Sequence, residues 1–382
     1  MIYLDNCATT KPRKEVIDKI IESFEKGFAN PSSLHSFGQD VENKIEEARK
    51  NVANLIGANP EEIYFTSGGT ESNNIALNGF IEKNKRFGNE IITTSVEHSS
   101  VIEKLKSYND QNYKVIEIGV DDKANINLSE LYSKITDKTI LVSIIHVNNE
   151  IGTIAPIKEI VEKIKNINKN IFIHVDGVQS YGKIKVDVKN LRCDSYSASG
   201  HKIHGPKGIG ILYLKKGINI EQLTYGGGQE KNLRSGTENV PGIVGIGEAS
   251  KIMFENFGEE QKRIRSLKQY LIEKINLNFN DFIINTPEES SPYILSVSFK
   301  DIRGEVLLHY LEQDEIYIST ASACTSNGTH KSKVLESMHL NKSYEDGTIR
   351  LCLSYEISET DIDNFIDKLK IYVNEIRDII KR

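Results

Sequence analysis

The sequence has few of the features that would place it outside the ordinary globular proteins. It contains only 8 prolines, with 38% hydrophobic and 27% charged residues, which excludes a collagen-like or disordered chain. Its longest apolar stretch, from Ile140 to Val147, is far too short to cross a bilayer. No basic stretch followed by an apolar one opens the chain, so we expect no export signal and a cytoplasmic location. The net charge of -6 gives no reason to expect nucleic acid or a membrane surface as a partner.

Cysteine is also scarce. Cys7, Cys193, Cys324 and Cys352 lie far apart and form no CxxC pair, so neither a zinc ribbon nor a redox pair is indicated and no metal site is predicted. In a reducing cytoplasm all four are expected to be free thiols. Cys352, between two leucines, has the neighbours of a buried structural thiol. Cys324 lies among small polar residues, a composition typical of an exposed and reactive thiol.

The middle of the chain alternates short β-branched runs with helical stretches, which predicts an α/β fold with a mostly parallel, seven-stranded sheet. The last candidate strand follows Gly205-Pro206 closely, a spacing that suits a hairpin return. The seven candidate strands are Ile63 to Phe65, Glu90 to Thr94, Lys114 to Ile118, Ile140 to Val147, Ile171 to Val175, Asp194 to Ala198 and Ile209 to Leu214.

A chain of 382 residues is too long for one small core, so two lobes are expected. After about residue 256 the pattern changes to a long polar helix (Glu259 to Asn276), a strand (Tyr293 to Phe299), a helix from Gly304 and a terminal helix. We therefore predict a large domain over residues 13–256 and a smaller α/β domain formed by residues 1–12 and 257–382.

Five polar clusters follow predicted strands at their carboxyl ends, where ligands bind in open α/β sheets. The glycine turn at residues 66–73 opens a helix and offers backbone N–H groups to a phosphate, although a plain helix cap is the commoner meaning of such a turn. His98 on its own would most often be a capping or core residue. The polar run at residues 146–150 is one that a buried strand would not normally tolerate unpaired. Asp176 could equally be a helix N-cap.

The fifth cluster contains Lys202, between Ser199-Gly200-His201 and the rigid Gly205-Pro206 turn. Lysines usually lie on the surface, but this one has the setting of an amine held in place. The clusters together suit pyridoxal phosphate (PLP). A lysine forms a Schiff base with that cofactor, a carboxylate pairs with its pyridinium nitrogen, a ring covers its face, and Gly, Ser, Thr and His donors hold its phosphate.

At these residues the chain resembles the NifS/IscS-type cysteine desulfurases, a branch of the class V aminotransferase family with the fold type I PLP architecture. The likeness covers essentially the whole length, from Tyr3-Leu4-Asp5-Asn6 through Asn30-Pro31-Ser32-Ser33-Leu34-His35 to Ser322-Ala323-Cys324-Thr325-Ser326. It implies an enzyme that converts L-cysteine to L-alanine and leaves a persulfide on Cys324, for transfer to an acceptor protein in iron–sulfur cluster assembly or thiolation.

The resemblance also implies roles for single residues. Lys202 carries PLP and, once freed, removes the α-proton of the substrate, while Cys324 attacks the sulfur. Arg350 clamps the substrate carboxylate with its planar fork. The other implied positions are Asp176 at the pyridine nitrogen, His98 stacked on the ring, Gln179 and Asn149 near the ring hydroxyl and substrate, and Gly69, Thr70, Ser199 and His201 at the phosphate, with Thr237 added by the second subunit of a homodimer.

The sequence departs from the family pattern at several places. Cys7 replaces the usual alanine, as a core filler or as a second thiol near the site. Ser354-Tyr355 replaces a common Gly-Arg pair, and Asn232 stands in a turn often occupied by glycine. The chain ends at Arg382 without the longer tail by which some members engage an iron–sulfur scaffold, so the sulfur acceptor and its pathway stay open.

Two other functions compete with desulfuration. A selenocysteine lyase or another PLP enzyme of β-elimination would share every cofactor residue, and would differ in whether it needs Cys324. A sulfur-relay or scaffold protein on a degenerate fold is disfavoured by the intact Lys202, Asp176, His98 and Arg350. Residues 319–333 are mostly small and polar, so we also predict a mobile segment around Cys324, with this thiol well away from the Lys202 amine.

Overall fold

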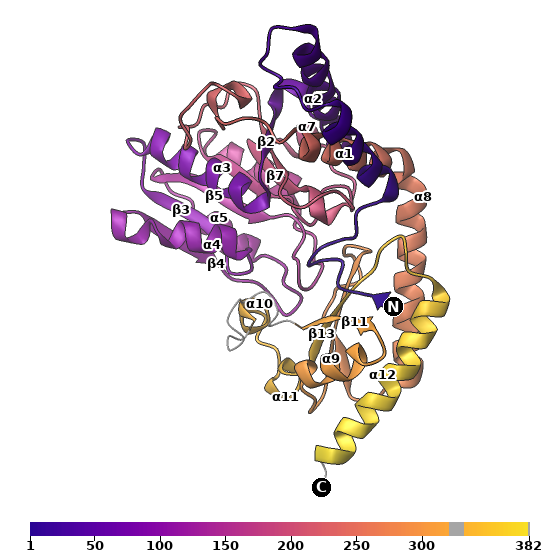
Figure 1. Ribbon diagram of the computed structural model, residues 1–382. Coiled ribbons are helices and arrows are strands. Elements are labelled where there is room, and N and C mark those ends of the chain that lie inside the picture. The colour runs from indigo at the N-terminus through magenta and orange to yellow at the C-terminus, as the bar shows by residue number, and fades with distance from the viewer. Residues whose placement is uncertain (321–331, 381–382) are drawn as a thin grey trace.

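A seven-stranded sheet forms the centre of the larger lobe in the computed structural model, which describes residues 1–320 and 332–380 (Figure 1). The strand order is β2-β8-β7-β6-β5-β3-β4. Only β8 runs antiparallel to its neighbours, and it forms the predicted hairpin return with β7. The predicted fold class is therefore confirmed. The strands are β2 (Ile63–Thr66), β3 (Glu90–Thr94), β4 (Lys114–Ile118), β5 (Thr139–Ile145), β6 (Phe172–Asp176), β7 (Ser195–Ser199) and β8 (Gly210–Leu214).

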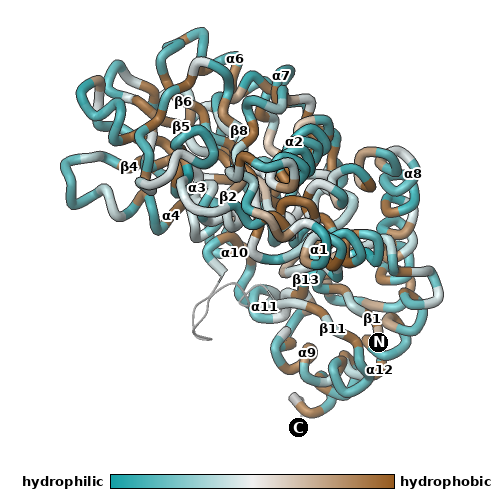
Figure 2. The backbone as a smooth tube through the Cα atoms, turned by 45° about the horizontal axis from the view of Figure 1, so that its top comes forward, coloured by the Kyte–Doolittle hydropathy of each residue, from teal (hydrophilic) through white to brown (hydrophobic). Residues whose placement is uncertain are grey.

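The central strands are buried along their whole length, because helices connect them and cover the sheet. Figure 2 shows hydrophobic residues gathered in the strands and hydrophilic ones along outer helices such as α2. Among the described helices, none is long and apolar enough to span a membrane. The helices of this lobe are α1 (Lys14–Lys26), α2 (Ser36–Leu55), α3 (Gly69–Asn84), α4 (Ser99–Lys106), α5 (Leu128–Ser133), α6 (Ile157–Ile167) and α7 (Val188–Leu191).

The longest helix, α8 (Val240–Asn278), packs against α1 and α2 and then continues into the smaller lobe. The predicted helix from Glu259 to Asn276 is only its second half. Glycines in its first half permit close packing: a Cβ atom on Gly247 would lie 2.5 Å from the Cβ of Ala48. The helix crosses residue 256 without a break, and the predicted domain boundaries stay a prediction.

The smaller lobe contains an antiparallel sheet of order β12-β13-β10-β9. Its core joins this sheet to α12 and the second half of α8. The N-terminus also belongs here, because β1 pairs in parallel with β11. The elements are β1 (Ile2–Tyr3), β9 (Phe282–Ile284), β10 (Ile294–Phe299), β11 (Ile316–Tyr317), β12 (Ser319–Thr320), β13 (Thr348–Cys352), α9 (Gly304–Glu312), α10 (Lys333–Ser337), α11 (Lys342–Glu345) and α12 (Glu359–Ile380).

Candidate active site

Residues that follow the carboxyl ends of β3, β5, β6 and β7 meet around a cavity of about 270 Å³ between the two lobes. Of the predicted site residues, all except Thr237 and Cys324 line it. Thr237 is exposed and lies outside the cavity of its own chain. Cys324 and the segment predicted to move around it lie outside the described residues. The lining residues are Cys7, Ala8, Gly69, Thr70, His98, Ser100, Ile145, Asn149, Asp176, Val178, Gln179, Ser199, His201, Lys202 and Arg350.

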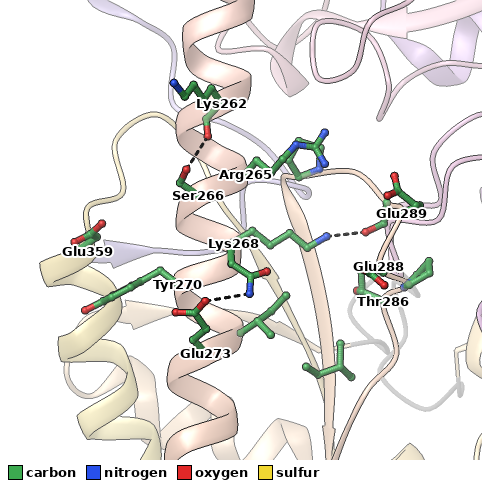
Figure 3. Close-up of a pocket in the computed structure, with 16 residues that line it drawn as sticks. Lys262, Arg265, Ser266, Lys268, Tyr270, Glu273, Thr286, Glu288, Glu289 and Glu359 are labelled. Atoms are coloured by element: carbon green, nitrogen blue, oxygen red, sulfur yellow. Dashed lines mark hydrogen bonds between the residues drawn. The ribbon is translucent and has the colours of Figure 1, made fainter.

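A larger cavity of about 980 Å³ lies beside α8 in the smaller lobe (Figure 3). Its walls carry charges of both signs, such as Arg265, Lys268 and Glu288. Lys268 donates to the Ser290 hydroxyl (2.7 Å) and to the Ser291 carbonyl (2.9 Å), so this amine is occupied in local structure. No predicted site residue lines this cavity. The smaller cavity is therefore the candidate active site.

Asp176 ends β6 with its carboxylate buried in the cavity wall. One oxygen accepts from the backbone N–H of Val178 (3.0 Å), and the other accepts from the Asn73 amide (2.8 Å). Gly177 makes this turn possible, because a Cβ atom there would overlap the Tyr196 ring at 1.9 Å. The two donors hold the carboxylate in one orientation.

Asn73 and His174 orient Asp176 and were not singled out as site residues from the sequence. His174 Nε2 lies 2.9 Å from Asn73 Oδ1, and Ser195 Oγ lies 2.7 Å from His174 Nδ1. Burial lowers the pKa of His174 to about 4, so this ring is neutral, donates from Nε2 and accepts at Nδ1. The amide of Asn73 is thereby fixed with its nitrogen toward Asp176. The sequence contained one signal for each residue: Asn73 lies beside the glycine turn, and His174 lies two residues before Asp176.

His98 both caps a helix and lines the cavity. As N-cap of α4, its Nδ1 accepts from the backbone N–H of Ser100 (3.1 Å) and lies 2.8 Å from the Ser100 hydroxyl. That hydroxyl in turn accepts from the Asn73 amide (2.9 Å). The ring also lines the cavity, and burial lowers its pKa, so neutral imidazole faces the ligand space.

Lys202 lies in the short 3-10 turn after β7 and lines the cavity. Its amine donates to the backbone carbonyls of Cys7 and Ala8, the latter at 2.8 Å. The N-terminal segment of the smaller lobe therefore contacts the lysine directly. No local pattern predicts this contact between residues nearly 200 positions apart.

Gln179 is held from both sides of its amide. The nitrogen donates to the Cys7 carbonyl (3.0 Å), and the oxygen accepts from the Lys183 amine (2.8 Å). Lys183 is buried, and desolvation together with Lys202 and Arg350 lowers its pKa well below the usual value. Lys183 is thus a second amine beside the site, missed from the sequence although it lies only four residues beyond Gln179.

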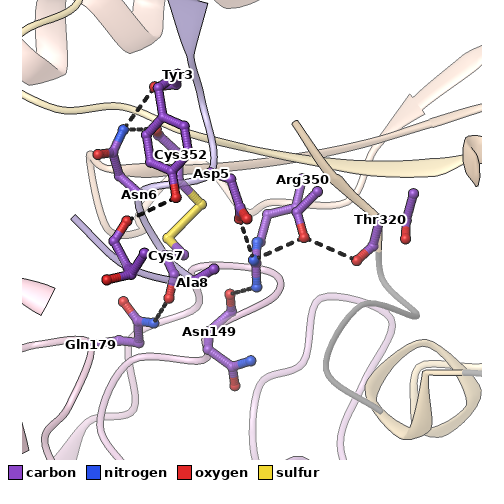
Figure 4. Close-up of polar contacts among 12 residues, drawn as sticks. Tyr3, Asp5, Asn6, Cys7, Ala8, Asn149, Gln179, Thr320, Arg350 and Cys352 are labelled. Atoms are coloured by element: carbon purple, nitrogen blue, oxygen red, sulfur yellow. Dashed lines mark hydrogen bonds and ion pairs between the residues drawn. A yellow bond between two sulfur atoms is a disulfide. The ribbon is translucent and has the colours of Figure 1, made fainter. Parts of the chain in front are cut away.

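Arg350 lies on β13 and reaches across to the larger lobe (Figure 4). Its Nη1 donates to the Asn149 carbonyl (3.0 Å), and its Nη2 donates to Asp5 Oδ1 (2.9 Å) and to Ser319 Oγ (3.0 Å). Its buried Nε has no hydrogen-bond partner among the described residues. An orphaned N–H of this kind is costly unless an acceptor arrives, so Arg350 suits the carboxylate of a ligand.

The first turn of α3, which begins at Gly69, also lines the cavity. A Cβ atom at Gly69 would lie 2.5 Å from Val178 Cγ2, so only glycine lets this helix end approach the Asp176 turn. Ser199 and His201 border the same space. Burial and the nearby lysines lower the pKa of His201 to about 4, so it is a neutral donor or acceptor. A helix N-terminus with such side chains suits a phosphate.

The cysteine predictions were partly wrong. Cys7 and Cys352 form a disulfide, with Cα atoms 5.7 Å apart (Figure 4), instead of the expected free thiols. The expectation came from the compartment and from the absence of a CxxC pair, and neither reports on contacts between the two ends of the chain. Cys193 is a buried free thiol, as expected.

Two departures from the family pattern have local explanations. Tyr355 packs under the guanidinium of Arg13, 3.9 Å from the ring centroid, and meets the His204 ring edge-on at 4.7 Å. Through these two contacts Tyr355 connects the segment after β13 to the larger lobe. Asn232 has a φ angle of 68°, a left-handed conformation that asparagine tolerates better than most residues.

The family model for class-V aminotransferases matches residues 2–365, so the chain belongs to the class-V aminotransferase family. Its curated relatives include a cysteine desulfurase IscS of Clostridium botulinum, 40% identical over 99% of this chain and 96% of that protein. Another cysteine desulfurase IscS, of Methanosarcina thermophila, is 39% identical over 99% of this chain and 93% of its own. The predicted family resemblance is confirmed.

Solved structures agree with this assignment. A NifS-like protein superposes with a TM-score of 0.92 at 38% identity, over 98% of this chain and 99% of the other. SspA in complex with cysteine has a TM-score of 0.82 at 32% identity, over 92% of this chain and 99% of the other. The fold is thus shared along nearly the whole length.

Proposed function

We propose that this protein is a PLP-dependent cysteine desulfurase, which converts L-cysteine to L-alanine and places the sulfur on Cys324. One observation carries the proposal: four groups with the required chemistry line one cavity. They are the amine of Lys202, the carboxylate of Asp176 with its two hydrogen-bond donors, the neutral imidazole of His98 and the guanidinium of Arg350. Relatives at about 40% identity that are named cysteine desulfurases support it.

The donor set of the cavity fits PLP. Asp176 has one side turned to the cavity, where it can pair with the ring nitrogen, and His98 can cover the ring face. Gln179 presents its fixed amide N–H to the ring hydroxyl, beside Asn149. Gly69, Thr70, Ser199 and His201 surround the space for a phosphate. PLP, when bound, supplies the electron sink that makes the substrate's α-proton acidic.

The chain's own groups perform the remaining tasks. Arg350 binds the substrate carboxylate, and its unsatisfied Nε–H gains an acceptor in doing so. Lys202 Nζ, which would hold PLP, would as a free amine be the base that takes the α-proton. The Cys324 thiolate attacks the substrate sulfur, so that the C–S bond breaks, alanine leaves and a persulfide forms. An acceptor protein then takes that sulfur.

We also propose a homodimer in which Thr237 completes the phosphate site of the neighbouring subunit. Thr237 is exposed and lies outside its own cavity, which supports a role toward another chain. Phe24 and Phe28, on and after α1, are 67% and 74% exposed, and a second subunit would cover these two apolar side chains. A fully active, PLP-replete monomer in sedimentation experiments would contradict the dimer.

The function is tested with purified protein and L-cysteine. We expect PLP on Lys202, located by borohydride reduction and peptide mapping, and alanine release in step with sulfide. Lys202→Ala should lose the covalently bound PLP and the release of alanine. Lys207→Ala, which changes an exposed lysine of the same loop, should keep both properties. Cofactor on another lysine, or no alanine from cysteine, would refute the proposal. Turnover of selenocysteine that does not need Cys324 would indicate the lyase instead.

A further inference from the structure

The two ends of the chain are joined beside the candidate active site. Cys7 and Cys352 are separated by 345 residues, and their Cα atoms lie 5.7 Å apart. This spacing falls within the range that a disulfide requires, so the S–S bond can form or open without a large backbone movement. Neighbouring backbone contacts maintain the approach: Cys352 N–H donates to the Leu4 carbonyl (2.6 Å) and the Asn6 amide donates to the Cys352 carbonyl (2.9 Å).

The two cysteines differ in their position relative to the cavity. Both are buried, Cys352 completely and Cys7 with 2% exposed, but only Cys7 lines the candidate active site. Small molecules that enter this cavity therefore meet Cys7 first. Cys193 provides the contrast, because it is buried away from the cavity and desolvation raises its pKa, which makes it a poor nucleophile.

Each cysteine is coupled to a group of the site. The Cys7 carbonyl accepts from Gln179 and Lys202, and Cys352 is two residues from Arg350 on the same strand. Between them, Asp5 places a carboxylate oxygen 2.9 Å from Arg350 Nη2. In this position Asp5 competes with any ligand carboxylate for the guanidinium.

We propose that Cys7 and Cys352 are a redox-active pair, oxidised by a small peroxide and reduced by a small thiol, that controls how readily Arg350 accepts a substrate carboxylate. In oxidation by hydrogen peroxide one thiolate breaks the O–O bond and becomes a sulfenic acid, and the second thiolate displaces its oxygen, so that one H2O2 and two protons yield two waters and the disulfide. In reduction an external thiolate attacks Cys7, Cys352 leaves as a thiolate, and a second external thiol releases the first as a small disulfide.

The oxidised pair ties residues 4–8 to β13 and so keeps Asp5 on Arg350. Reduction removes the covalent tie and leaves only hydrogen bonds, so that Asp5 can yield to a substrate more easily. The oxidised enzyme should therefore bind an amino-acid carboxylate more weakly than the reduced enzyme. The functional consequence, though not the redox chemistry, rests on the function proposed above.

The test uses the full-length holoenzyme with Cys324→Ser, which removes the proposed nucleophile from the thiol chemistry. After hydrogen peroxide, non-reducing peptide mapping should find the Cys7–Cys352 cross-link, and dithiothreitol should remove it. L-Alanine affinity, measured by calorimetry, should fall by about tenfold on oxidation, the effect of one weakened charge-assisted hydrogen bond. A further Cys7→Ala change should abolish the peroxide effect, whereas Cys193→Ser should keep it.

Absence of the cross-link after peroxide would overturn the proposal, as would a cross-link that leaves L-alanine affinity unchanged. If Cys7→Ala fails to fold, mapping and calorimetry on the parent protein still decide. Neither readout needs sulfur transfer. If the Cys324→Ser protein passes both tests but the protein with Cys324 intact never releases alanine from cysteine, the proposed function is refuted and the redox pair stays in place.

Discussion

Glu150 is a buried carboxyl whose ionisation should limit stability at neutral and alkaline pH. It follows Asn149 at the cavity, and Oε2 accepts from the Ser332 hydroxyl at 2.5 Å. Burial raises its pKa to about 7, although Ser332 and Arg350 act in the opposite direction. A folded-state pKa above the unfolded value means that the protonated form stabilises the fold. This stability is complete below about pH 4.5 and is lost as the pH rises to about 7.

Glu150→Gln keeps the neutral form at every pH and an oxygen for Ser332. The shift from about 4.5 to about 7 corresponds to roughly 3 kcal/mol when Glu150 is ionised. Between pH 5 and pH 8 the free energy of unfolding of the variant, relative to the parent, should therefore rise by about 2 to 3 kcal/mol and then level off. Any constant cost of the substitution cancels in this difference.

Urea denaturation followed by circular dichroism would measure it, since the chain has no tryptophan to report by fluorescence. Glu255→Gln, at an exposed position of α8, is the matched control and should show no such trend with pH. A difference between Glu150→Gln and the parent that stays constant from pH 5 to pH 8 would show that Glu150 is already ionised at the acid end.

Three further predictions concern the site. Arg350→Ala should raise the KM for cysteine by about 10- to 100-fold with unchanged PLP content, because it removes a charge-assisted pair; equal kinetics would show that another group holds the carboxylate. Lys183→Met should shift the pH dependence of the cofactor's visible absorption, since it frees the Gln179 amide to turn, and Lys183→Arg should restore it in part; an unmoved titration would contradict this positioning role. Cys324→Ser should keep PLP and bind cysteine but lose persulfide formation and nearly all alanine release; normal turnover would eliminate Cys324 as the nucleophile.

Local sequence patterns predicted the sheet well, because its strands are short β-branched runs and each is followed by polar residues. Those patterns also singled out Lys202 and Asp176, whereas Arg350 came from the family resemblance. All three line one cavity, although their roles stay predictions. Strand ends differ from the predicted ones by one or two residues, as for Ile140 to Val147 against β5. Such boundaries depend on tertiary hydrogen bonds that no local pattern records.

Two features could not be predicted, for different physical reasons. The start of α8 contains Gly242, Gly245 and Gly247, which lower helix propensity. Tertiary packing overrides that preference, because the glycines let α1 and α2 approach the helix closely. The contacts of Cys7 depend on residues more than 170 positions away in the sequence, so composition around Cys7 could not reveal its partner.

The uninterrupted course of α8 limits how the molecule can bend. With 39 residues the helix is about 58 Å long, and its backbone ladder continues through the position where the two lobes divide in sequence. A hinge there would have to break several helical hydrogen bonds at once, so the two lobes should move together as one rigid body. A fragment ending at residue 256 would stop inside this helix and leave the N-terminal strand without its partner, β11. The lobes are thus poor candidates for separate expression, and adjustment to a ligand falls to short segments such as residues 4–8.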